Sequence, residues 1–454
     1  MEKKTDELAA DSLSIWESIV MGVAGAAPAF SVSVVTATLA ATVGTLAPAS
    51  ILYCGFIMFG ITLAFIHLNK VYVNAGASYA WVSKIFGRNL GFFAGWALLV
   101  SASVFMVSGT IPAATATLLL IAPGLVNDPV WVTSVAAFWL TFIALVTLKG
   151  IKLSSYVQLL MTVIEIAILI AIIIAGFHHY LSLPAREFSW SWFSITDFTP
   201  NLFATGALSA VFLYWGWDVT LNLNEETANN KHAPGWGAFW SVLIVILLFV
   251  CFAVVTLMVL SDPEIQNAGT NILFVIADSI FPKPWGYLAI VSVLLSTAGT
   301  LETNILQFTR TLFAKGRDGV MHSRYARLHQ SWKTPWVSIL FIWFFGMALL
   351  LLSSNFSTVA LIIKDSVNAI GFQVAFYYSL TGLACAWYYR DKWKNIFELL
   401  IFVIWPFLSS LFLIFIACFS IPTFDWVTNA VGFGGILLGF IPFFLNYGAN
   451  KRIS

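Results

Sequence analysis

Three acidic residues stand inside apolar stretches of the chain, where an ionised side chain is costly. They are Glu165, Asp218 and Glu302. A single charge at membrane depth costs about 2.5 to 3.5 kcal/mol even on the permissive insertion scale. We therefore expect these carboxyl groups to be paired, hydrogen-bonded or protonated, and to be able to bind a proton, a cation or an amine.

Each acid has a functional and a structural interpretation. Glu165 lies too far from either end of its apolar stretch to reach water easily, so it either binds a proton or cation or is a neutral group bonded to a neighbouring helix. Asp218 could accept a hydrogen bond from an ammonium group or cap a helix. Glu302 is expected to form an ion pair with a basic residue such as Arg310.

Two of the apolar stretches are interrupted by residues that disfavour a continuous helix. The first contains the run from Gly22 to Pro28, and the sixth contains the run from Tyr214 to Asp218. Pro28 lacks an N–H group and clashes with the preceding turn, so the first helix should break there. The sixth stretch continues into Glu225 and Glu226, which either gate or brace one mouth of the molecule or lie in solvent.

The two interruptions open comparable blocks of five apolar stretches, at 15–177 and 200–390. Matched broken helices are the best sequence indication of a midplane binding site built from inverted repeats. Half-helix N-termini would offer N–H groups to a carboxylate, and the opposing carbonyl groups would suit a cation. Trp215 and Trp217 could close over a small ammonium group. The alternatives are ordinary kinks and ordinary aromatic packing.

The elements that must position these residues are membrane-spanning helices. The 454 residues are 60% hydrophobic and 9% charged, whereas about 25% of the residues of a soluble domain are charged. An apolar stretch of about 20 residues crosses a hydrocarbon core of about 30 Å, and only helices satisfy their backbone groups there. The sequence therefore predicts an all-α integral membrane protein with twelve transmembrane helices. Their expected ranges are 15–44, 48–66, 92–122, 131–148, 155–177, 200–224, 237–260, 285–309, 336–352, 357–381, 396–417 and 430–447.

The remaining segments are expected to be tails and loops. Residues 1–14 and 448–454 would form cytoplasmic tails, and 396–447 would hold helices eleven and twelve. The segment 262–284 is expected to contain a short external helix. The acidic and basic residues mixed in the first seventeen positions are unlike a cleavable signal peptide, so we expect no cleavage.

The distribution of basic residues predicts the orientation. With both termini in the cytoplasm, 19 of the 22 Lys and Arg residues lie on the cytoplasmic side and 3 on the other side. This bias is the usual one for membrane proteins. We therefore expect a multi-pass protein of the cytoplasmic (inner) membrane.

Several classes of protein are disfavoured by composition. The formal net charge of +1 gives no reason to expect a nucleic-acid partner. The four cysteines lack the spacing of metal ligands, and the six histidines lie in expected loops or at the ends of spans. We expect no metal, no cofactor and no enzymatic activity. A channel would be expected to show a repeated filter motif, and none is visible in the sequence.

Motifs in three regions resemble one transporter family. The residues from Asn74 to Trp81, followed by Phe86-Gly87 and by the run from Gly91 to Trp96, are similar to a family signature between the second and third helices. The run from Arg310 to Gly319 is similar to the family's loop after helix eight. With the Gly-rich first helix, these motifs resemble the amino acid–polyamine–organocation transporters over nearly the whole chain.

The resemblance implies a leucine-transporter-type fold with a 5+5 inverted repeat, two further helices, and uptake or exchange of an amino acid by alternating access. It places a substrate-carboxylate cradle on Gly25, Ala26 and Ala27. It places a second wall of the site on the helix-six segment. The residues of that wall are Tyr214, Trp215, Gly216, Trp217 and Asp218.

The sequence departs from the family pattern in ways that bear on substrate and coupling. Ala26 and Ala27, followed by Pro28, replace the Ser-Gly pair of many members, which points to a smaller or weaker carboxylate site. Glu165 stands where proton-coupled members carry a lysine. Hydroxyl groups on a membrane helix bond more often to their own backbone than to an ion, so proton coupling or simple exchange is preferred to sodium coupling. A sodium site would use hydroxyl groups of Ser296, Thr297 and Thr300, and Glu302 is a further candidate coupling residue. The main alternative substrate is a polyamine or another amine without a carboxylate.

Overall fold

The computed structural model describes residues 7–181, 184–353, 359–392 and 395–450. Over these ranges the chain is helical, and extended backbone pairs only in an isolated bridge between Leu13 and Thr227. Within the same ranges, ten helical stretches are long and apolar enough to cross a membrane. The prediction of an all-helical protein with many apolar spans is confirmed.

The helices of the first block follow one another with short connections. They are α1 (Ile15–Gly25), α2 (Pro28–Val43), α3 (Ala47–Val71), α4 (Ser78–Phe86), α5 (Arg88–Ser108), α6 (Thr110–Ile121), α7 (Pro129–Leu148) and α8 (Ile151–Tyr180). The stretch expected at 92–122 is thus made of two consecutive helices, α5 and α6, that meet at Gly109.

The second block and the C-terminal region are also helical. They comprise α9 (Pro200–Leu213), α10 (Val219–Asn222), α11 (Ala233–Val259), α12 (Asp262–Ala268), α13 (Ile272–Ile280), α14 (Leu288–Arg317), α15 (Trp336–Ser353), α16 (Val359–Tyr388), α17 (Ile396–Leu399), α18 (Trp405–Ser420), α19 (Trp426–Asn429), α20 (Gly435–Leu437) and α21 (Phe440–Asn450). The external helix expected at 262–284 consists of two short helices, α12 and α13.

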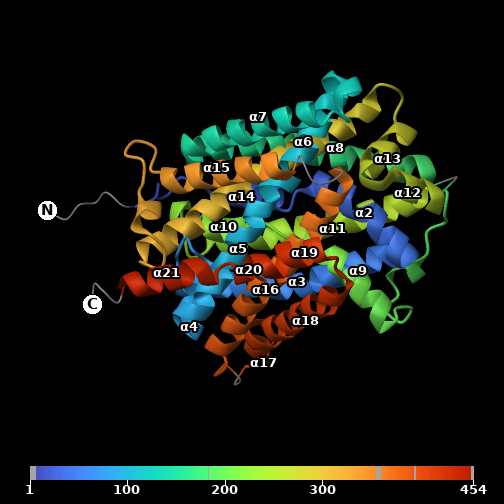
Figure 1. Cartoon of the computed structure of the whole chain (residues 1–454). Helices are drawn as coiled ribbons and strands as arrows, with labels where there is room; N and C mark the ends of the chain where they lie inside the picture. Colours follow the sequence, from blue (N-terminus) through green and yellow to red (C-terminus); the bar gives the residue numbers. More distant parts are fainter. Residues whose placement is uncertain (1–6, 182–183, 354–358, 393–394, 451–454) are drawn as a thin grey trace.

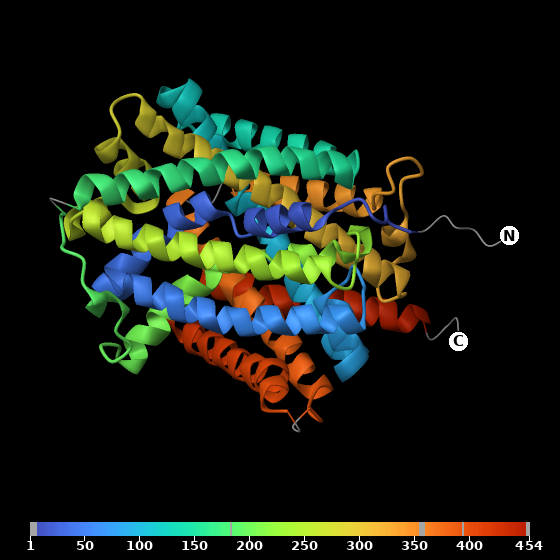
Figure 2. The same cartoon turned by 180° about the vertical axis from the view of Figure 1, so that it is seen from behind.

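The long helices lie side by side in one bundle, and the two chain termini leave it at the same end (Figures 1 and 2). We call this end the terminus side and the other end the opposite side. α14 begins at the opposite side and runs through the interior, where it packs against α1, α2, α6 and α8. Residues Ser296 to Gly316 of α14 are all buried.

Burial in this bundle is inverted relative to a soluble protein. α14 carries many polar residues and is nevertheless buried over most of its length. The outer helices expose large apolar side chains, such as Leu160 on α8, which is 64% exposed, and Phe344 on α15, which is 70% exposed. Water disfavours such a surface and lipid accepts it. The chain is therefore a multi-pass membrane protein.

Candidate functional site

The first helix breaks where the sequence predicts. α1 ends at Gly25 and α2 begins at Pro28. A residue before proline is disfavoured in the right-handed helical region and usually becomes extended. Ala27 instead adopts a left-handed backbone with φ of 49°. A left-handed residue other than glycine costs roughly 1 to 2 kcal/mol, and its presence in a buried helix marks a position that the surrounding fold holds in place.

The second break lies between α9 and α10, from Tyr214 to Asp218. Gly216 has φ of 100°, which only glycine adopts readily. The two breaks touch, because a Cβ atom on Gly25 would lie 2.1 Å from the carbonyl oxygen of Gly216, and a Cβ atom on Gly216 would lie 2.1 Å from that of Gly25. Two segments that are 190 residues apart in the sequence therefore meet backbone to backbone.

The N–H groups of the expected carboxylate cradle are engaged in this conformation. The Ala26 N–H donates to Val23 O and the Ala27 N–H donates to Ala24 O, each at 3.1 Å. The Ser31 hydroxyl also donates to Ala26 O at 2.9 Å. Binding of a carboxylate here requires these short local bonds to open, and the cradle remains a prediction.

Glu165 lies at the N-terminus of α2. Its Oε1 accepts a hydrogen bond of 2.9 Å from the Ala29 N–H, and the side chain is 1% exposed. The adjacent Phe30 N–H donates to the Ser296 hydroxyl at 3.2 Å, and this hydroxyl also contacts the Glu165 carboxylate. An anion is favoured at this position, because the first N–H groups of a helix have no partner in their own helix.

The candidate sodium ligands on α14, which are the hydroxyl groups of Ser296, Thr297 and Thr300, bond to different partners. The Thr300 hydroxyl donates to Ala24 O at 2.6 Å and so reaches the first break, beside Ser296. The Thr297 hydroxyl donates only within its own helix, to Val293 O and Leu294 O. Of the proposed sodium ligands, Ser296 and Thr300 thus lie together at the break. The described part of the chain contains no cluster of His, Cys, Asp and Glu that could hold a metal ion.

Asp218 is buried and accepts three hydrogen bonds from distant side chains. The donors are Gln307 at 2.7 Å, Tyr377 at 3.0 Å and Tyr378 at 2.9 Å. Asp218 occupies the position before α10, but its side chain makes no capping bond to that helix. The capping interpretation is therefore wrong. The three donors were not predicted from the sequence, in which the adjacent Tyr377 and Tyr378 inside an apolar span are the available signal.

The aromatic residues of the second break have separate roles. The Trp215 Nε1–H donates to the Tyr377 hydroxyl at 3.1 Å and so joins the Asp218 network. The Tyr214 hydroxyl donates to Ile51 O on α3 at 2.7 Å, which anchors the break to its neighbour. Trp217 packs against Phe65. The Trp217 Nε1–H is buried and has no hydrogen-bond partner among the described residues.

The expected ion pair between Glu302 and Arg310 is absent, and this expectation is wrong. Eight residues of helix separate the two side chains by about 12 Å along the axis. Arg310 instead binds Glu226 in a bidentate pair, at 2.8 and 2.9 Å, with both side chains fully buried. Glu302 accepts a short hydrogen bond from the Ser154 hydroxyl on α8.

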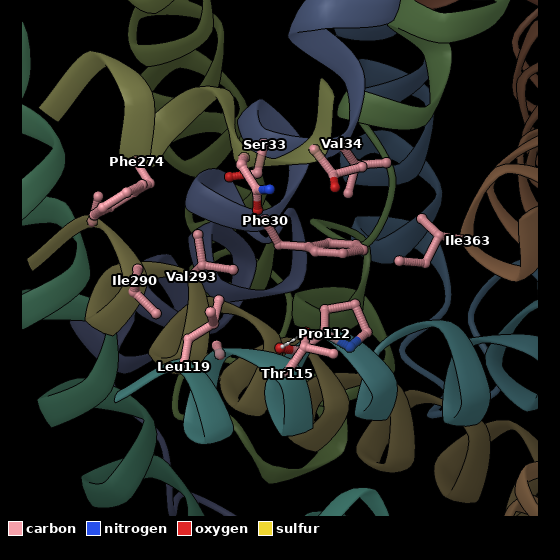
Figure 3. A pocket seen from close by; sticks show the side chains of 14 residues that line it. Phe30, Ser33, Val34, Pro112, Thr115, Leu119, Phe274, Ile290, Val293 and Ile363 are labelled. Atoms are coloured by element: carbon pink, nitrogen blue, oxygen red, sulfur yellow. Dashed lines mark hydrogen bonds between the residues drawn. The ribbon is translucent and has the colours of Figure 1, made fainter. Parts of the chain in front are cut away.

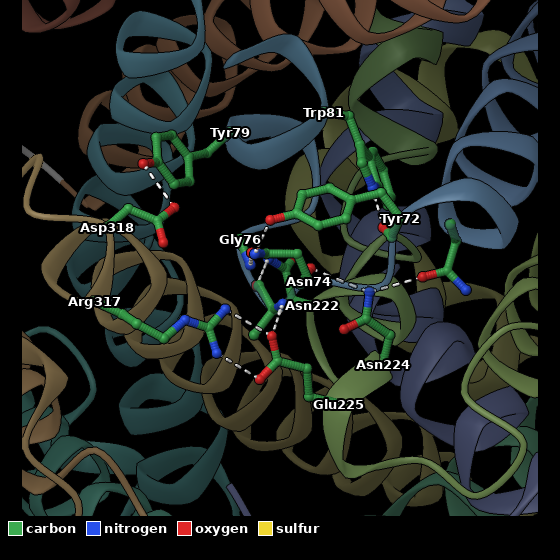
Figure 4. A network of polar contacts seen from close by, with 12 residues as sticks. Tyr72, Asn74, Gly76, Tyr79, Trp81, Asn222, Asn224, Glu225, Arg317 and Asp318 are labelled. Carbon is green, nitrogen blue, oxygen red and sulfur yellow. Dashed lines mark hydrogen bonds and ion pairs between the residues drawn. The ribbon is translucent and has the colours of Figure 1, made fainter. Parts of the chain in front are cut away.

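A polar network closes the terminus side (Figure 4). Glu225 forms a bidentate pair with Arg317 at 2.9 and 2.8 Å and accepts from the Ala75 N–H at 2.8 Å. Asn222 donates to Ala75 O at 2.8 Å, and Asn224 joins the same loop through other bonds. Glu225 and Glu226 therefore brace this end, and the solvated interpretation fails for Glu226, which is 0% exposed.

The same end contains a buried phenol. The Tyr79 hydroxyl donates to the Asp318 carboxylate at 3.0 Å. Burial and the negative charge of Asp318 raise the pKa of Tyr79 well above its usual value. Tyr79 therefore stays neutral and continues to donate this hydrogen bond at physiological pH.

A cavity lies among α2, α6, α13 and α14, near the opposite side (Figure 3). Its volume is about 600 Å³ with the open mouth included, and Phe30, Pro112 and Val293 are among the residues that line it. Ser33 and Thr115 contribute hydroxyl groups to a wall that is otherwise mainly apolar. Phe30 lies close to the first break in sequence, but neither Gly25 to Pro28 nor Tyr214 to Asp218 is among the residues that line the cavity.

Comparison with known proteins gives a consistent family. The family model for amino acid permeases matches residues 13–441. The serine/threonine exchanger SteT of Bacillus subtilis is 22% identical over 399 residues, which cover 87% of this chain and 85% of that protein. The low-affinity putrescine importer PlaP of Escherichia coli is 25% identical over 344 residues, covering 73% and 71%.

A human relative is similar over a comparable length. The large neutral amino acids transporter small subunit 2 of Homo sapiens is 24% identical over 409 residues, which cover 86% of this chain and 72% of that protein. The broken helices that meet at Gly25 and Gly216 are the arrangement expected of a transporter that binds its substrate at the membrane midplane. Because the family model covers most of its length, the chain belongs to the amino acid permease family, whose members are transporters and not enzymes.

Proposed function

We propose that the chain is a secondary transporter that takes up or exchanges an amino acid by alternating access. The observation that carries the proposal is the backbone contact between Gly25 and Gly216. Paired interruptions of this kind supply backbone groups for a substrate near the midplane of the membrane. In the proposed site, Gly25, Ala26 and Ala27 receive the carboxylate, and residues 214–218 form the opposite wall.

The proposed topology has twelve crossings with the leucine-transporter-type 5+5 repeat. In this topology α1 with α2, and α9 with α10, each form one broken crossing. Residues 15–177 and 200–390 are the two repeats, and 396–447 supply two further crossings. An even number of crossings agrees with the two termini leaving at the same end (Figure 1). The distribution of Lys and Arg supports a cytoplasmic location for both termini in the cytoplasmic membrane.

The proposed coupling element is Glu165, which binds a proton. Its support is the bond between the Glu165 carboxylate and the Ala29 N–H at the start of α2. Protonation weakens this charge-assisted bond and so frees α2 to move relative to α8. Sodium coupling is the less favoured form. It would use the Ser296 and Thr300 hydroxyls together with Ala24 O.

A second candidate substrate is an amine without a carboxylate. The N–H groups of the cradle are engaged, whereas three carboxyl groups, Glu165, Asp218 and Glu302, are buried nearby without a basic partner among the described residues. Such a region provides acceptors for an ammonium group. The putrescine importer among the relatives is the kind of carrier that this alternative describes.

A ligand screen with the purified full-length protein distinguishes the two substrates. Thermal unfolding is measured with each amino acid and with its decarboxylated amine at two pH values, because a ligand that binds the folded state stabilises it. Stabilisation by amino acids, followed by their uptake into proteoliposomes, supports the first proposal. Stabilisation by amines alone would replace it with the second. If Glu165→Gln keeps full transport with unchanged pH dependence, the coupling proposal fails.

A further inference from the structure

One face of α8 is polar and buried, and the opposite face is apolar and exposed. The buried polar residues recur at intervals of one, three or four, which keeps them on one side of a helix. They are Ser154, Ser155, Gln158, Thr162 and Glu165. The exposed side carries Leu160 and Val163, which are 64% and 55% exposed. An anchoring helix needs no buried polar stripe, because each buried polar group is costly unless it is bonded.

The stripe faces α14 and the start of α1, and we call the whole assembly the polar seam. Its members are Ser154, Ser155, Gln158, Thr162 and Glu165 of α8, Ser296 and Glu302 of α14, and Glu17 of α1. α8 packs against both α1 and α14 along this length. The seam therefore runs from the terminus side to the first helix break.

The terminus-side entrance of the seam reaches solvent. The Lys152 ammonium group, whose side chain is 53% exposed, lies 3.1 Å from the Glu17 carboxylate. The Ser155 hydroxyl lies 3.3 Å from the same carboxylate. On the preceding residue, the Ser154 hydroxyl donates to Glu302. Solvent at Glu17 is thus separated from the buried Glu302 carboxylate by two adjacent serine side chains.

Gln158 connects the middle of the seam. In the one orientation that satisfies both amide atoms, its nitrogen donates to Gly299 O at 3.0 Å and to Glu302 Oε2 at 3.3 Å. Its oxygen then accepts from the Thr162 hydroxyl at 3.0 Å. Thr162 precedes Glu165 by one helical turn, and Glu165 bonds to the Ala29 N–H. Hydrogen bonds thus link Glu302 through Gln158 to Thr162, and one helical turn separates Thr162 from Glu165.

The seam has two buried acids and no buried base. The charged side chains on α14, α1 and α10 near Glu302 have other partners. Asp218 binds Gln307, Tyr377 and Tyr378, Arg310 binds Glu226, and Glu17 binds Lys152. Further along α14, Lys315 donates to Phe92 O and Arg317 pairs with Glu225. Glu165 likewise meets only the Ala29 N–H and Ser296 among the described residues. Two neighbouring carboxyl groups in such surroundings are suited to hold protons.

We propose that the polar seam is the path by which protons reach Glu165 from the terminus side, with Glu302 as an intermediate acceptor. This inference rests on the proposed role of Glu165 as a proton-binding residue. A proton from water at Glu17 binds the Glu302 carboxylate. It then passes through the hydroxyl groups, with water completing the line, to the Glu165 carboxylate. Glu302 is left as an anion and takes up the next proton, so no other reactant is needed.

The test follows the protonation of Glu165 directly. The full-length protein is reconstituted into vesicles with its termini facing the medium, the pH of the medium is lowered rapidly, and the carboxyl stretch is recorded by time-resolved infrared spectroscopy. The Glu165 signal is the part that disappears in Glu165→Gln. We expect Glu302→Gln to slow this signal by about tenfold or more. Gln158→Leu removes the hydrogen bonds between Glu302 and Thr162 without removing a carboxylate, and it should slow the Glu165 signal to a similar extent.

A buried hydroxyl outside the seam provides the control. The Ser292 hydroxyl on α14 donates only to Ala289 O of its own helix, so Ser292→Ala should leave the rate unchanged. A wild-type rate in both Glu302→Gln and Gln158→Leu would overturn the path. If the wild-type protein shows no signal that depends on Glu165, the proposed proton coupling fails instead. Gln158→Leu retains the test if Glu302→Gln does not fold.

Discussion

The two ends of the molecule are built differently. At the terminus side, two ion pairs tie α14 to the segment after α10. They are the buried pair of Arg310 with Glu226 and the partly exposed pair of Arg317 with Glu225. At the opposite side, a cavity of about 600 Å³ with its mouth included reaches Phe30, next to the first break. The terminus side is held together by ion pairs and side-chain amides, whereas the opposite side contains a cavity lined mainly by apolar groups.

This difference explains how one chain can expose a central site to one side at a time. Charge pairs can be separated and re-formed as units, whereas apolar walls close by packing. In the conformation described, ion pairs hold the terminus side together, and a cavity lies near the opposite side. Some changes weaken the ion pairs of the terminus side, and others fill the cavity of the opposite side. The two kinds of change should shift the equilibrium between the two access states in opposite directions.

The largest expected effect comes from the buried ion pair. Arg310→Ala leaves the Glu226 carboxylate buried without its partner, and we expect a loss of about 3 to 5 kcal/mol in the free energy of unfolding. Denaturant unfolding of the purified protein measures this loss. The double variant Arg310→Ala with Glu226→Ala should recover part of it. Equal losses in the single and double variants would contradict the pairing.

The contact between the breaks gives the next largest effect. Gly216→Ala places a Cβ atom against Gly25 O and strains a backbone with φ of 100°, so we expect a cost of about 1 to 3 kcal/mol together with loss of transport. Gly87→Ala is the matched control, because its φ is 94° but no atom lies within 4 Å of the added Cβ. Measurements of unfolding and uptake for both variants separate the effect of the Gly25 contact from the effect of backbone strain. Equal effects would show that contact contributes nothing.

Filling the cavity of the opposite side should impair function with little effect on folding. Val34 lines the cavity, and Val34→Trp should reduce uptake by about tenfold, which corresponds to about 1.4 kcal/mol. Phe344→Trp changes a 70% exposed side chain on the outer surface and serves as the control. Uptake into proteoliposomes is compared at equal protein content. Normal uptake by Val34→Trp would exclude the cavity as the route to the site.

The partly exposed pair at the terminus side should have the smallest effect. The Arg317 side chain is 34% exposed and that of Glu225 is 19% exposed, so solvent weakens their attraction. We expect Arg317→Gln to change the free energy of unfolding by about 0.2 to 1 kcal/mol. The same denaturant titration measures it. A loss as large as that of Arg310→Ala would mean that this pair, rather than the buried one, closes the end.

The sequence predicted the local features of the site better than its long-range contacts. The break before Pro28 follows from the missing N–H group, and the depth of Glu165 follows from the length of its span. The donors to Asp218 come from α14 and α16, as much as 160 residues away. The wrong partner for Glu302 has the same cause, because proximity in sequence suggested Arg310 and tertiary packing supplied Ser154.

The most direct test of this account is the accessibility of the two ends in the presence of substrate. The four native cysteines are first replaced. A single cysteine is then introduced either at Thr311, which accepts a hydrogen bond from Asn222 at the terminus side, or at Ser33, which lines the cavity. A membrane-impermeant thiol reagent then measures each labelling rate with and without the amino acid identified in the screen. Alternating access predicts that substrate, with a proton gradient, raises labelling at residue 311 and lowers it at residue 33. Rates that stay unchanged, or that move in the same direction, would contradict it.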